Sequence, residues 1–196
     1  MNLPNKITTF RMICVIFIAV LLLIPTEGMI VIPFVDVSLT TFIAWILFIV
    51  ASISDFVDGY IARKYNLVTD YGKFMDPIAD KLLVNTVLII LSAFNVIPVI
   101  CVIIMIARDT IVDAVRMNAV RKNIVVAANI FGKIKTVLQM IALIMILIND
   151  FGLSALLSLP EGLYLGQIVL YLATIASFIS GVIYLIQNRS VFSEMK

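Results

Sequence analysis

Long runs of uncharged, mostly apolar residues dominate this chain of 196 residues. They cover residues 12–26, 37–54, 82–107, 136–149 and 162–188. A helix of about 20 apolar residues is long enough to cross the hydrocarbon core of a bilayer. Apolar residues make up 63% of the chain and charged residues 13%, whereas soluble domains have about 45–50% and about 25%. We therefore predict an integral membrane protein built from helices.

The run 82–107 decides how many times the chain crosses the membrane. It is long enough for one span, but Asn95 and Pro98 form a turn signal that would divide it into two helices. Lys and Arg gather on the cytoplasmic side of membrane proteins. Two helices place all 14 Lys and Arg residues on one side, whereas a single span divides them six against eight. The predicted fold is therefore all-α, with six transmembrane helices, cytoplasmic N- and C-termini and a single domain over residues 1–196.

The two helices within 82–107 are each too short to span a bilayer, so they must continue past charged residues on both sides. This places several ionisable residues at the cytoplasmic interface, and such residues in membrane helices usually mark a function. They are Asp76, Asp80, Arg108, Asp109, Asp113 and Arg116. The helix that starts near residue 37 is likewise expected to run to about Ala62, which carries Asp55 and Asp58 out of the membrane.

Histidine is absent from the chain, and the net charge is only +2. The absence of histidine excludes a Ser-His-Asp triad, His-ligated zinc and acid–base catalysis by imidazole. The small net charge, without a basic run, argues against nucleic-acid binding. Cys14 and Cys101 lie in separate apolar runs and are expected to be small packing residues rather than a disulfide.

Four aspartates occupy two adjacent predicted helices near the interface. Asp55 and Asp58 are three residues apart and Asp76 and Asp80 are four apart, so each pair lies on one helix face. The polar connection 64–71 folds the two helices antiparallel, so the two faces can meet. Four carboxylates that converge in a low dielectric repel one another, so either some are protonated or cations neutralise them. Mg²⁺ combines carboxylates with substrate phosphates, whereas zinc would require Cys or His.

Gly59, Arg63 and Gly72 lie within the same stretch. The glycines remove side chains where a large group approaches the backbone, and Arg63 is near enough to the aspartates to bind a phosphate. The alternative is a pair of solvated acidic helix ends whose carboxylates pair with neighbouring lysines, Lys81 among them. The whole set at fixed spacing inside 26 residues is far more specific than a group of solvated charges.

The spacing of this set resembles the signature of a known family. The pattern D-x2-D-G-x2-A-R-x8-G-x3-D-x3-D is similar to that of the CDP-alcohol phosphatidyltransferases. The positions that match it without departure are Asp55, Asp58, Gly59, Ala62, Arg63, Gly72, Asp76 and Asp80. The resemblance implies a homodimer in the cell membrane, with a polar cavity that opens to the cytoplasm between the helices.

The resemblance also implies a role for each matching position. Asp55, Asp58 and Asp76 would hold a centre of two Mg²⁺ or Mn²⁺ ions, which Asp80 completes. Asp80 would also be the general base that takes a proton from the acceptor hydroxyl, since no histidine is present. Ions that bridge a pyrophosphate neutralise the charge that develops during phosphoryl transfer. The residues implied in contact with the cytidine nucleotide and its pyrophosphate are Gly59, Arg63 and Gly72.

Two further segments resemble bacterial phosphatidylglycerophosphate synthases, a branch of this family. The first is segment 2–11 (NLPNKITTFR), in which Asn5 and Thr8 would face the nucleotide or pyrophosphate. Its alternative is a helix N-cap followed by an interfacial turn. The second is segment 132–139 (GKIKTVLQ), in which Lys135 and Gln139 would point into the helix bundle.

Three cations are expected to bind a phosphate on the acceptor, namely Arg108, Arg116 and Lys135. Arg108 and Arg116 are eight residues apart, about two helical turns, and share a helix face. A phosphorylated acceptor needs such a pocket, whereas serine, choline or ethanolamine does not. The alternative is that these residues are ordinary cytoplasmic charges, or that Asp109 and Asp113 pair with them.

The function implied by the resemblance is transfer of the phosphatidyl group from CDP-diacylglycerol to sn-glycerol 3-phosphate, which gives phosphatidylglycerol phosphate and CMP. We expect a single displacement without a covalent enzyme intermediate. Inositol phosphate, or phosphatidylglycerol as in cardiolipin synthesis, is an alternative acceptor within the family. A cation transporter is a further alternative, because acidic residues in membrane helices also line ion paths. It is disfavoured because the carboxylates lie at one interface and no internal repeat is present.

Overall fold

A computed structural model of the chain describes residues 2–26, 30–33, 35–65, 69–121, 130–157, 160 and 164–188, apart from the side chains of Leu3, Arg63, Asp70, Lys73, Val120, Arg121 and Ala155. Six long helices make up most of this part: α1 (Leu3–Leu23), α2 (Leu39–Lys64), α3 (Asp70–Ala93), α4 (Val99–Arg121), α5 (Ile130–Ile146) and α7 (Leu165–Gln187). The shorter elements are the antiparallel strands β1 (Val31–Ile32) and β2 (Val37–Ser38), the 3₁₀ helix η1 (Asn149–Gly152) and the single-turn helix α6 (Leu153–Leu156).

The helix boundaries follow local signals in the sequence. The run 82–107 is divided between α3 and α4, so the prediction of two helices is confirmed. Asn95, in the turn between them, has a left-handed backbone conformation (φ 59°), which asparagine tolerates better than most residues. At the start of α3, the Thr69 hydroxyl accepts a hydrogen bond from the backbone N–H of Gly72 at 3.0 Å. The connection between α2 and α3 is therefore short and ends in a capped helix.

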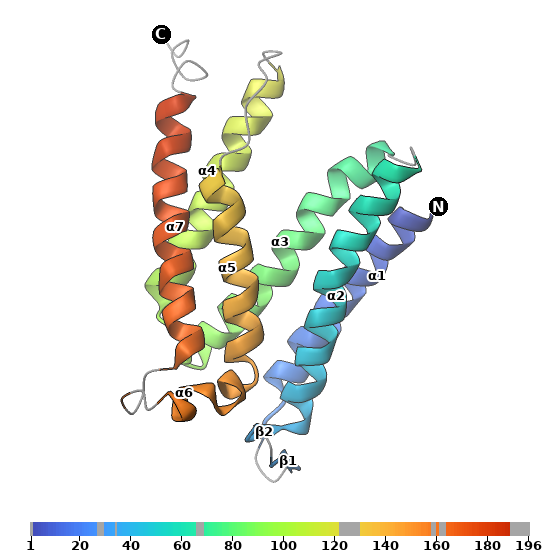
Figure 1. Ribbon diagram of the computed structural model, residues 1–196. Coiled ribbons are helices and arrows are strands. Elements are labelled where there is room, and N and C mark those ends of the chain that lie inside the picture. The colour runs from blue at the N-terminus through green and yellow to red at the C-terminus, as the bar shows by residue number, and fades with distance from the viewer. Residues whose placement is uncertain are drawn as a thin grey trace.

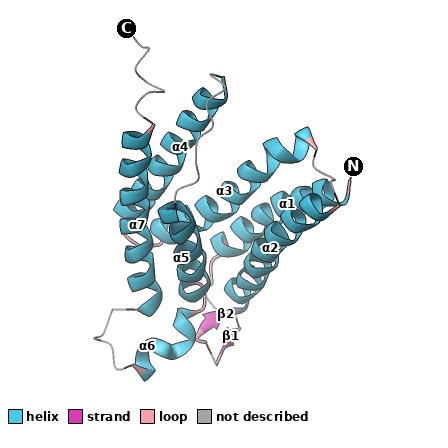
Figure 2. Cartoon of the chain, turned by 45° about the horizontal axis from the view of Figure 1, so that its top comes forward, coloured by secondary structure: helices cyan, strands magenta, loops and turns pink. Residues whose placement is uncertain are grey.

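The six long helices form two groups (Figures 1 and 2). In the first group α1 packs against α2 and α3, and in the second α7 packs against α4 and α5. The oblique helix α3 passes from one group to the other and connects to α4 at the end of the molecule where β1 and β2 lie, which we call the hairpin end (Figure 1). The opposite end, where α1 begins and α2 and α4 end, is called the N-terminal end.

A continuous hydrophobic core joins the two groups. Fully buried members of it are Ile18, Phe48, Leu88, Met105, Leu143 and Leu170. A hydrogen bond from Trp45 Nε1 to the carbonyl oxygen of Ile144 (3.0 Å) also links α2 to α5. Cys14 and Cys101 are free thiols buried in this core, as expected.

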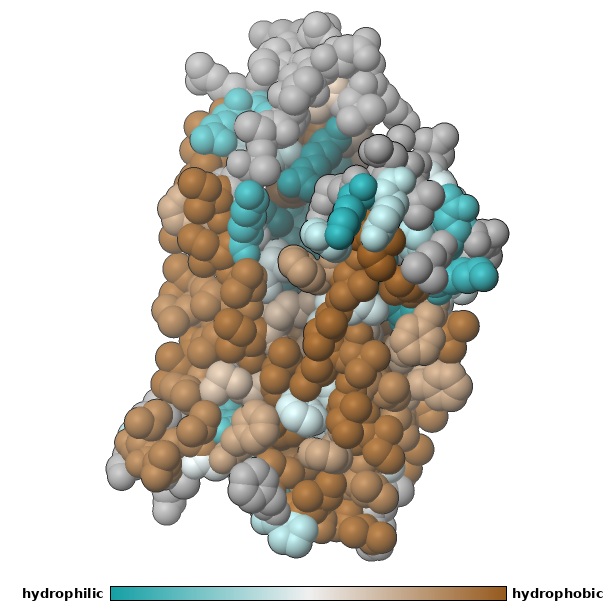
Figure 3. Space-filling view, turned by 45° about the vertical axis from the view of Figure 1, so that its right-hand side comes forward, coloured by the Kyte–Doolittle hydropathy of each residue, from teal (hydrophilic) through white to brown (hydrophobic). Residues whose placement is uncertain are grey.

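Large hydrophobic side chains also cover the outside of the molecule (Figure 3). Ile16, Phe17 and Ile175 are 65%, 58% and 56% exposed, which a lipid environment tolerates and water does not. Among the described residues, three segments are long and apolar enough to cross a membrane: Pro4–Leu23, Leu39–Ala62 and Leu165–Gln187. The chain is therefore a helical membrane protein.

Candidate active site

The acidic stretch of the sequence lies toward the N-terminal end of the molecule. Asp55 and Asp58 are near the end of α2, and Asp76 and Asp80 are near the start of the neighbouring α3. Asp58 interacts electrostatically with Asp55 and Asp76, and Asp80 interacts with Asp55. The four aspartates thus lie at adjoining ends of two neighbouring helices, and Asp58 is only 2% exposed. We call this group the acidic cluster.

A buried arginine from α1 stands between the first two aspartates. Arg11 is completely buried; its Nη1 lies 2.5 Å from Oδ1 of Asp55, and its Nη2 pairs with Oδ2 of Asp58. Because a buried carboxylate without a partner is costly, this guanidinium compensates for the charge of Asp58. The sequence-based prediction treated Arg11 only as a cytoplasmic charge. Its spacing from Asn5 and Thr8, six and three residues, was a signal that all three lie on one side of α1.

Asn5 and Thr8 also face the start of α3. Thr8 Oγ1 donates a hydrogen bond to Oδ1 of Asp76 at 2.6 Å, and Thr69 Oγ1 donates one to Oδ1 of Asn5 at 2.9 Å. A Cβ atom at Gly72 would lie 3.2 Å from Asn5 Oδ1, so the glycine lets α1 approach α3 closely. Asn2 is the N-cap of α1, and segment 2–11 continues as one helix from Leu3 onward.

Two further signature positions were predicted to contact the nucleotide, and both lie on α2. Gly59 directly follows Asp58. Arg63 occupies the last turn of α2, and its side chain lies outside the described part of the chain.

The chemistry of the acidic cluster fits a hard divalent cation. Its side chains offer carboxylate and hydroxyl oxygens, the ligands that Mg²⁺ and Mn²⁺ prefer, and no Cys or His is among them. Within the described residues, no three acidic, Cys or His side chains are close enough together to form a metal site. The positive charge in the cluster is supplied by Arg11 instead. Arg11 contacts one oxygen of each carboxylate, Oδ1 of Asp55 and Oδ2 of Asp58, so the second oxygen of each could still face a cation.

A cavity of about 540 Å³ opens between α3 and the second group of helices. Figure 3 shows hydrophilic side chains around a hollow at this end of the molecule. The three cations predicted to bind the acceptor phosphate, Arg108, Arg116 and Lys135, all line this cavity. Lys135 and Gln139 point into the bundle as predicted, since they are 4% and 2% exposed. We call this space the cationic cavity.

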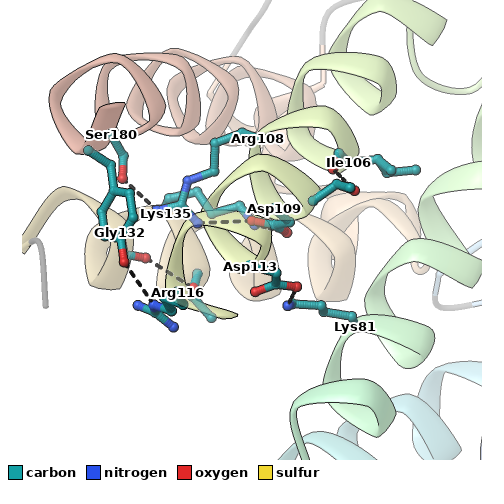
Figure 4. Close-up of polar contacts among 12 residues, drawn as sticks. Lys81, Ile106, Arg108, Asp109, Asp113, Arg116, Gly132, Lys135 and Ser180 are labelled. Atoms are coloured by element: carbon teal, nitrogen blue, oxygen red, sulfur yellow. Dashed lines mark hydrogen bonds and ion pairs between the residues drawn. The ribbon is translucent and has the colours of Figure 1, made fainter. Parts of the chain in front are cut away.

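Two aspartates of α4 pair with cations of the cavity (Figure 4). Asp109 accepts hydrogen bonds from Arg108 Nη1 at 2.9 Å and from Lys135 Nζ at 2.7 Å. Two positive charges and one negative charge leave this trio with a net charge of +1. Asp113 pairs with Lys81 of α3. The alternative that Asp109 pairs with the cations of the cavity is thus confirmed. Lys81, which could have paired with the signature aspartates, forms its ion pair with Asp113.

Helix α7 contacts the two arginines of the cavity through two polar side chains that no motif predicted. Ser180 Oγ accepts a hydrogen bond from Arg108 Nη2 at 2.6 Å, and Tyr184 OH accepts one from Arg116 Nε at 3.3 Å. Both residues lie inside the apolar run 162–188, where hydropathy carries no sign of a polar role.

The family model of the CDP-alcohol phosphatidyltransferases matches residues 1–179. The chain belongs to the CDP-alcohol phosphatidyltransferase family. One relative, the CDP-diacylglycerol–glycerol-3-phosphate 3-phosphatidyltransferase of Bacillus subtilis (strain 168), is 40% identical over 188 residues, which cover 95% of each chain. A protein of the same name from Rickettsia typhi is 38% identical over 192 residues, 97% of this chain and 99% of the relative. Another, from Mycoplasma genitalium, is 37% identical over 166 residues, 83% of this chain and 69% of the relative.

In this phosphatidyltransferase, Asp80 connects the acidic cluster to the cationic cavity. Among the described side chains of the signature, it alone lines the cavity. Besides its burial, its strongest electrostatic neighbours are Asp55 and Arg11 on the side of the cluster and Lys135 and Asp109 on the side of the cavity. Asp80 thus lies at the boundary between the acidic cluster and the cationic cavity.

Proposed function

We propose that this phosphatidyltransferase moves the phosphatidyl group from CDP-diacylglycerol to sn-glycerol 3-phosphate, giving phosphatidylglycerol phosphate and CMP. Relatives named for this pair of substrates are 37–40% identical to the chain. The observation that carries the choice of acceptor is the cavity in which Arg108, Arg116 and Lys135 lie beside Asp80. Guanidinium and ammonium groups bind a phosphate monoester through charge-assisted hydrogen bonds.

In the proposed reaction Asp80 is the general base. Among the described residues, its carboxylate takes part in no hydrogen bond or ion pair, so it is available to a substrate proton. The acceptor hydroxyl gives its proton to Asp80 while its oxygen bonds to the phosphorus next to diacylglycerol. The bond from this phosphorus to the oxygen of CMP breaks, and the electron pair leaves with CMP. The reaction is a single displacement, without a covalent enzyme intermediate.

The nucleotide and pyrophosphate are proposed to bind at the acidic cluster. Asn5 and Thr8 support this proposal, because both are buried beside α3 and Thr8 already contacts Asp76. The proposed contacts of the CDP group are Asn5, Thr8, Gly59, Arg63 and Gly72.

Asp55, Asp58, Asp76 and Asp80 are proposed to hold two Mg²⁺ or Mn²⁺ ions. When bound, such ions neutralise the charge that develops on the transferred group and on the leaving pyrophosphate oxygen. The oxygen-only donor set supports the proposal, as does the pairing of Asp55 and Asp58 with the guanidinium of Arg11, since both carboxylates already lie beside a positive charge.

We further propose that all six long helices cross the cell membrane, with both termini and the active site facing the cytoplasm. The Lys and Arg residues of α1, α2, α3 and α5 lie in the helix halves nearer the N-terminal end. Positive charge marks the cytoplasmic side of membrane proteins. A homodimer is proposed on the family resemblance alone, and the mass of the detergent-solubilised protein by light scattering tests it.

An acceptor panel tests the proposed function. Purified protein is mixed with CDP-diacylglycerol, Mg²⁺ and one acceptor: sn-glycerol 3-phosphate, inositol phosphate or phosphatidylglycerol. The proposal predicts CMP release and a phosphatidylglycerol phosphate product with sn-glycerol 3-phosphate. Faster CMP release with inositol phosphate or phosphatidylglycerol would identify that compound as the acceptor instead. A cation transporter would release no CMP with any of the three.

A further inference from the structure

Helix α7, which lies outside the sequence motifs, borders the cationic cavity through Tyr184. Ser180 and Tyr184 are four residues apart on this helix and are 0% and 1% exposed. They meet Arg108 and Arg116, which are eight residues apart on α4. The aromatic ring of Tyr184 also lies under the guanidinium of Arg116, 5.8 Å from the ring centre. Each arginine of the cavity thus has its own partner on α7.

The side chain of Arg108 passes close to α5 and α7 (Figure 4). A Cβ atom at Gly132 of α5 would lie 2.9 Å from its Nη2, and a Cβ atom at Gly181 of α7 would lie 3.0 Å from its Cγ. Both distances are too short for an unshifted side chain, so the two glycines make room for Arg108. A long arginine side chain loses much rotamer entropy on binding a ligand. The close approach of α5 and α7 restricts the rotamers of Arg108 before a ligand binds.

The hydrogen bonds of Arg108 leave part of its guanidinium for a ligand. Nη1 donates to Asp109 and Nη2 donates to Ser180, and each of these nitrogens carries a second hydrogen. The Nε atom is buried without a hydrogen-bond partner among the described residues. Arg116 is held through Nε by Tyr184, a bond that uses neither of its Nη atoms. Both guanidinium groups are therefore oriented by protein contacts that do not use up their donors.

We propose that Ser180 and Tyr184 of α7 are positioning residues, which orient Arg108 and Arg116 to receive the phosphate of the acceptor. This inference rests on the proposed function, because it assigns the phosphate of the acceptor to the cationic cavity. Tyr184 borders the cavity, but the role assigned to Tyr184 and Ser180 is to hold their arginines and not to bind the acceptor themselves. They act through the two arginines and so set the affinity for the phosphorylated acceptor without affecting the binding of the lipid donor.

The experiment compares Ser180→Ala and Tyr184→Phe with Ser177→Ala. Ser177 is a matched control, because it is also fully buried on α7 and its hydroxyl has no hydrogen-bond partner among the described residues. KM is measured for sn-glycerol 3-phosphate and for CDP-diacylglycerol, together with inhibition by inorganic phosphate. Ser180→Ala and Tyr184→Phe should each raise the KM for sn-glycerol 3-phosphate and the inhibition constant of phosphate about tenfold, the effect of one charge-assisted hydrogen bond. The KM for CDP-diacylglycerol should stay within about twofold, and Ser177→Ala should change neither KM.

The inference is overturned if the α7 variants raise both KM values equally, if they leave both unchanged, or if Ser177→Ala has the same effect. Tyr184→Phe removes a single oxygen atom. If Ser180→Ala does not fold, the KM values of Tyr184→Phe alone test the positioning role of α7. Arg108→Gln separates this inference from the proposed function. If Arg108→Gln leaves the KM for sn-glycerol 3-phosphate unchanged, the acceptor site itself is wrongly assigned. If Arg108→Gln raises that KM and the α7 variants do not, only the role of α7 is wrong.

Discussion

At the scale of single residues, Arg11 accounts for how the acidic cluster is stable within a membrane protein. Its guanidinium contacts Asp55 and the buried Asp58 at the same time, and it is itself completely buried. The Nε atom of Arg11 has no hydrogen-bond partner among the described residues, so the side chain is held mainly by these two carboxylates. The charge of Arg11 is therefore balanced by the acidic cluster itself.

Replacement of Arg11 by methionine should lower stability when divalent ions are absent. The change leaves Asp58 buried without its counter-ion, which costs about 3–5 kcal/mol for a broken buried pair. We expect a lower midpoint of thermal unfolding in chelator, and a larger gain on addition of Mg²⁺ than in the unmodified protein. Lys6→Met removes an exposed cation from the same helix and should change neither value. Equal midpoints for Arg11→Met and Lys6→Met in chelator would contradict the role given to Arg11.

Asp80→Asn should abolish turnover while nucleotide binding survives. Asparagine has nearly the same shape but cannot accept the proton, and the loss of a general base lowers rates by about 10²–10⁴-fold. CMP release measures the rate, and calorimetric titration with CMP measures binding. Asp36→Asn, an exposed carboxylate at the hairpin end, is the control and should keep full activity. If the Asp80→Asn protein releases CMP at a rate near that of the control, Asp80 is not the general base.

Residue spacing was sufficient to predict that the aspartates lie on neighbouring helix ends, but not which cations accompany them. Asp55, Asp58, Asp76 and Asp80 lie on neighbouring helices, as their spacing indicates. Arg11 was missed because a cation near the start of a membrane helix is expected at the interface, where such charges are common. Ser180 and Tyr184 were missed because their importance comes from a contact across about 70 residues of sequence. Local patterns contain no information about such contacts.

At the scale of elements, the start of α7 is fixed by a tight junction at the hairpin end. Asn149, Asp150 and Phe151 all have left-handed backbone conformations, with φ of 49°, 58° and 54°. The buried carboxylate of Asp150 accepts hydrogen bonds from the hydroxyl of Ser154 at 2.6 Å and from the backbone N–H of Gly166 at 2.9 Å. Asp150 therefore stabilises an unfavourable turn and satisfies the first turn of α7.

Gly166→Ala should destabilise this junction without changing the active site. A Cβ atom at this position would lie 2.6 Å from Oδ1 of Asp150 and 2.8 Å from Cγ1 of Ile146, so α7 or the turn must shift. Overpacking of this kind costs about 1–3 kcal/mol. We expect a lower midpoint of thermal unfolding, with KM values for both substrates unchanged at low temperature. An unchanged midpoint would show that the junction is not tight.

The long helices were predictable because hydropathy and turn residues act locally, whereas the small elements were not. The break after Ala93 follows the Asn95–Pro98 signal, and α2 runs to Lys64, close to the expected end at Ala62. Strands β1 and β2 have two residues each, which is too short for an alternating pattern to appear in a sequence. The turn at Asp150 depends on a contact with Gly166, sixteen residues further along the chain.

At the scale of the whole molecule, the proposed topology places the hairpin end and the N-terminal end on opposite sides of the membrane. Ile30 and Phe94 are 72% and 56% exposed near the hairpin end, and Tyr65 is 61% exposed at the N-terminal end. With the buried native cysteines replaced, Ile30→Cys and Phe94→Cys should react with an impermeant maleimide in intact cells. Tyr65→Cys should react only after permeabilisation. Labelling of Tyr65→Cys in intact cells, or protection of Phe94→Cys, would contradict the six-span topology.

Asp80 is proposed to stand between a site for the lipid-linked nucleotide and a site for a phosphorylated acceptor. The most direct test is the KM of Lys135→Ala for each substrate, measured by CMP release. The account predicts that the KM for sn-glycerol 3-phosphate rises about 10- to 100-fold, the effect of a lost charged hydrogen bond, while the KM for CDP-diacylglycerol stays nearly constant. An equal rise in both KM values, or no rise in either, would contradict it.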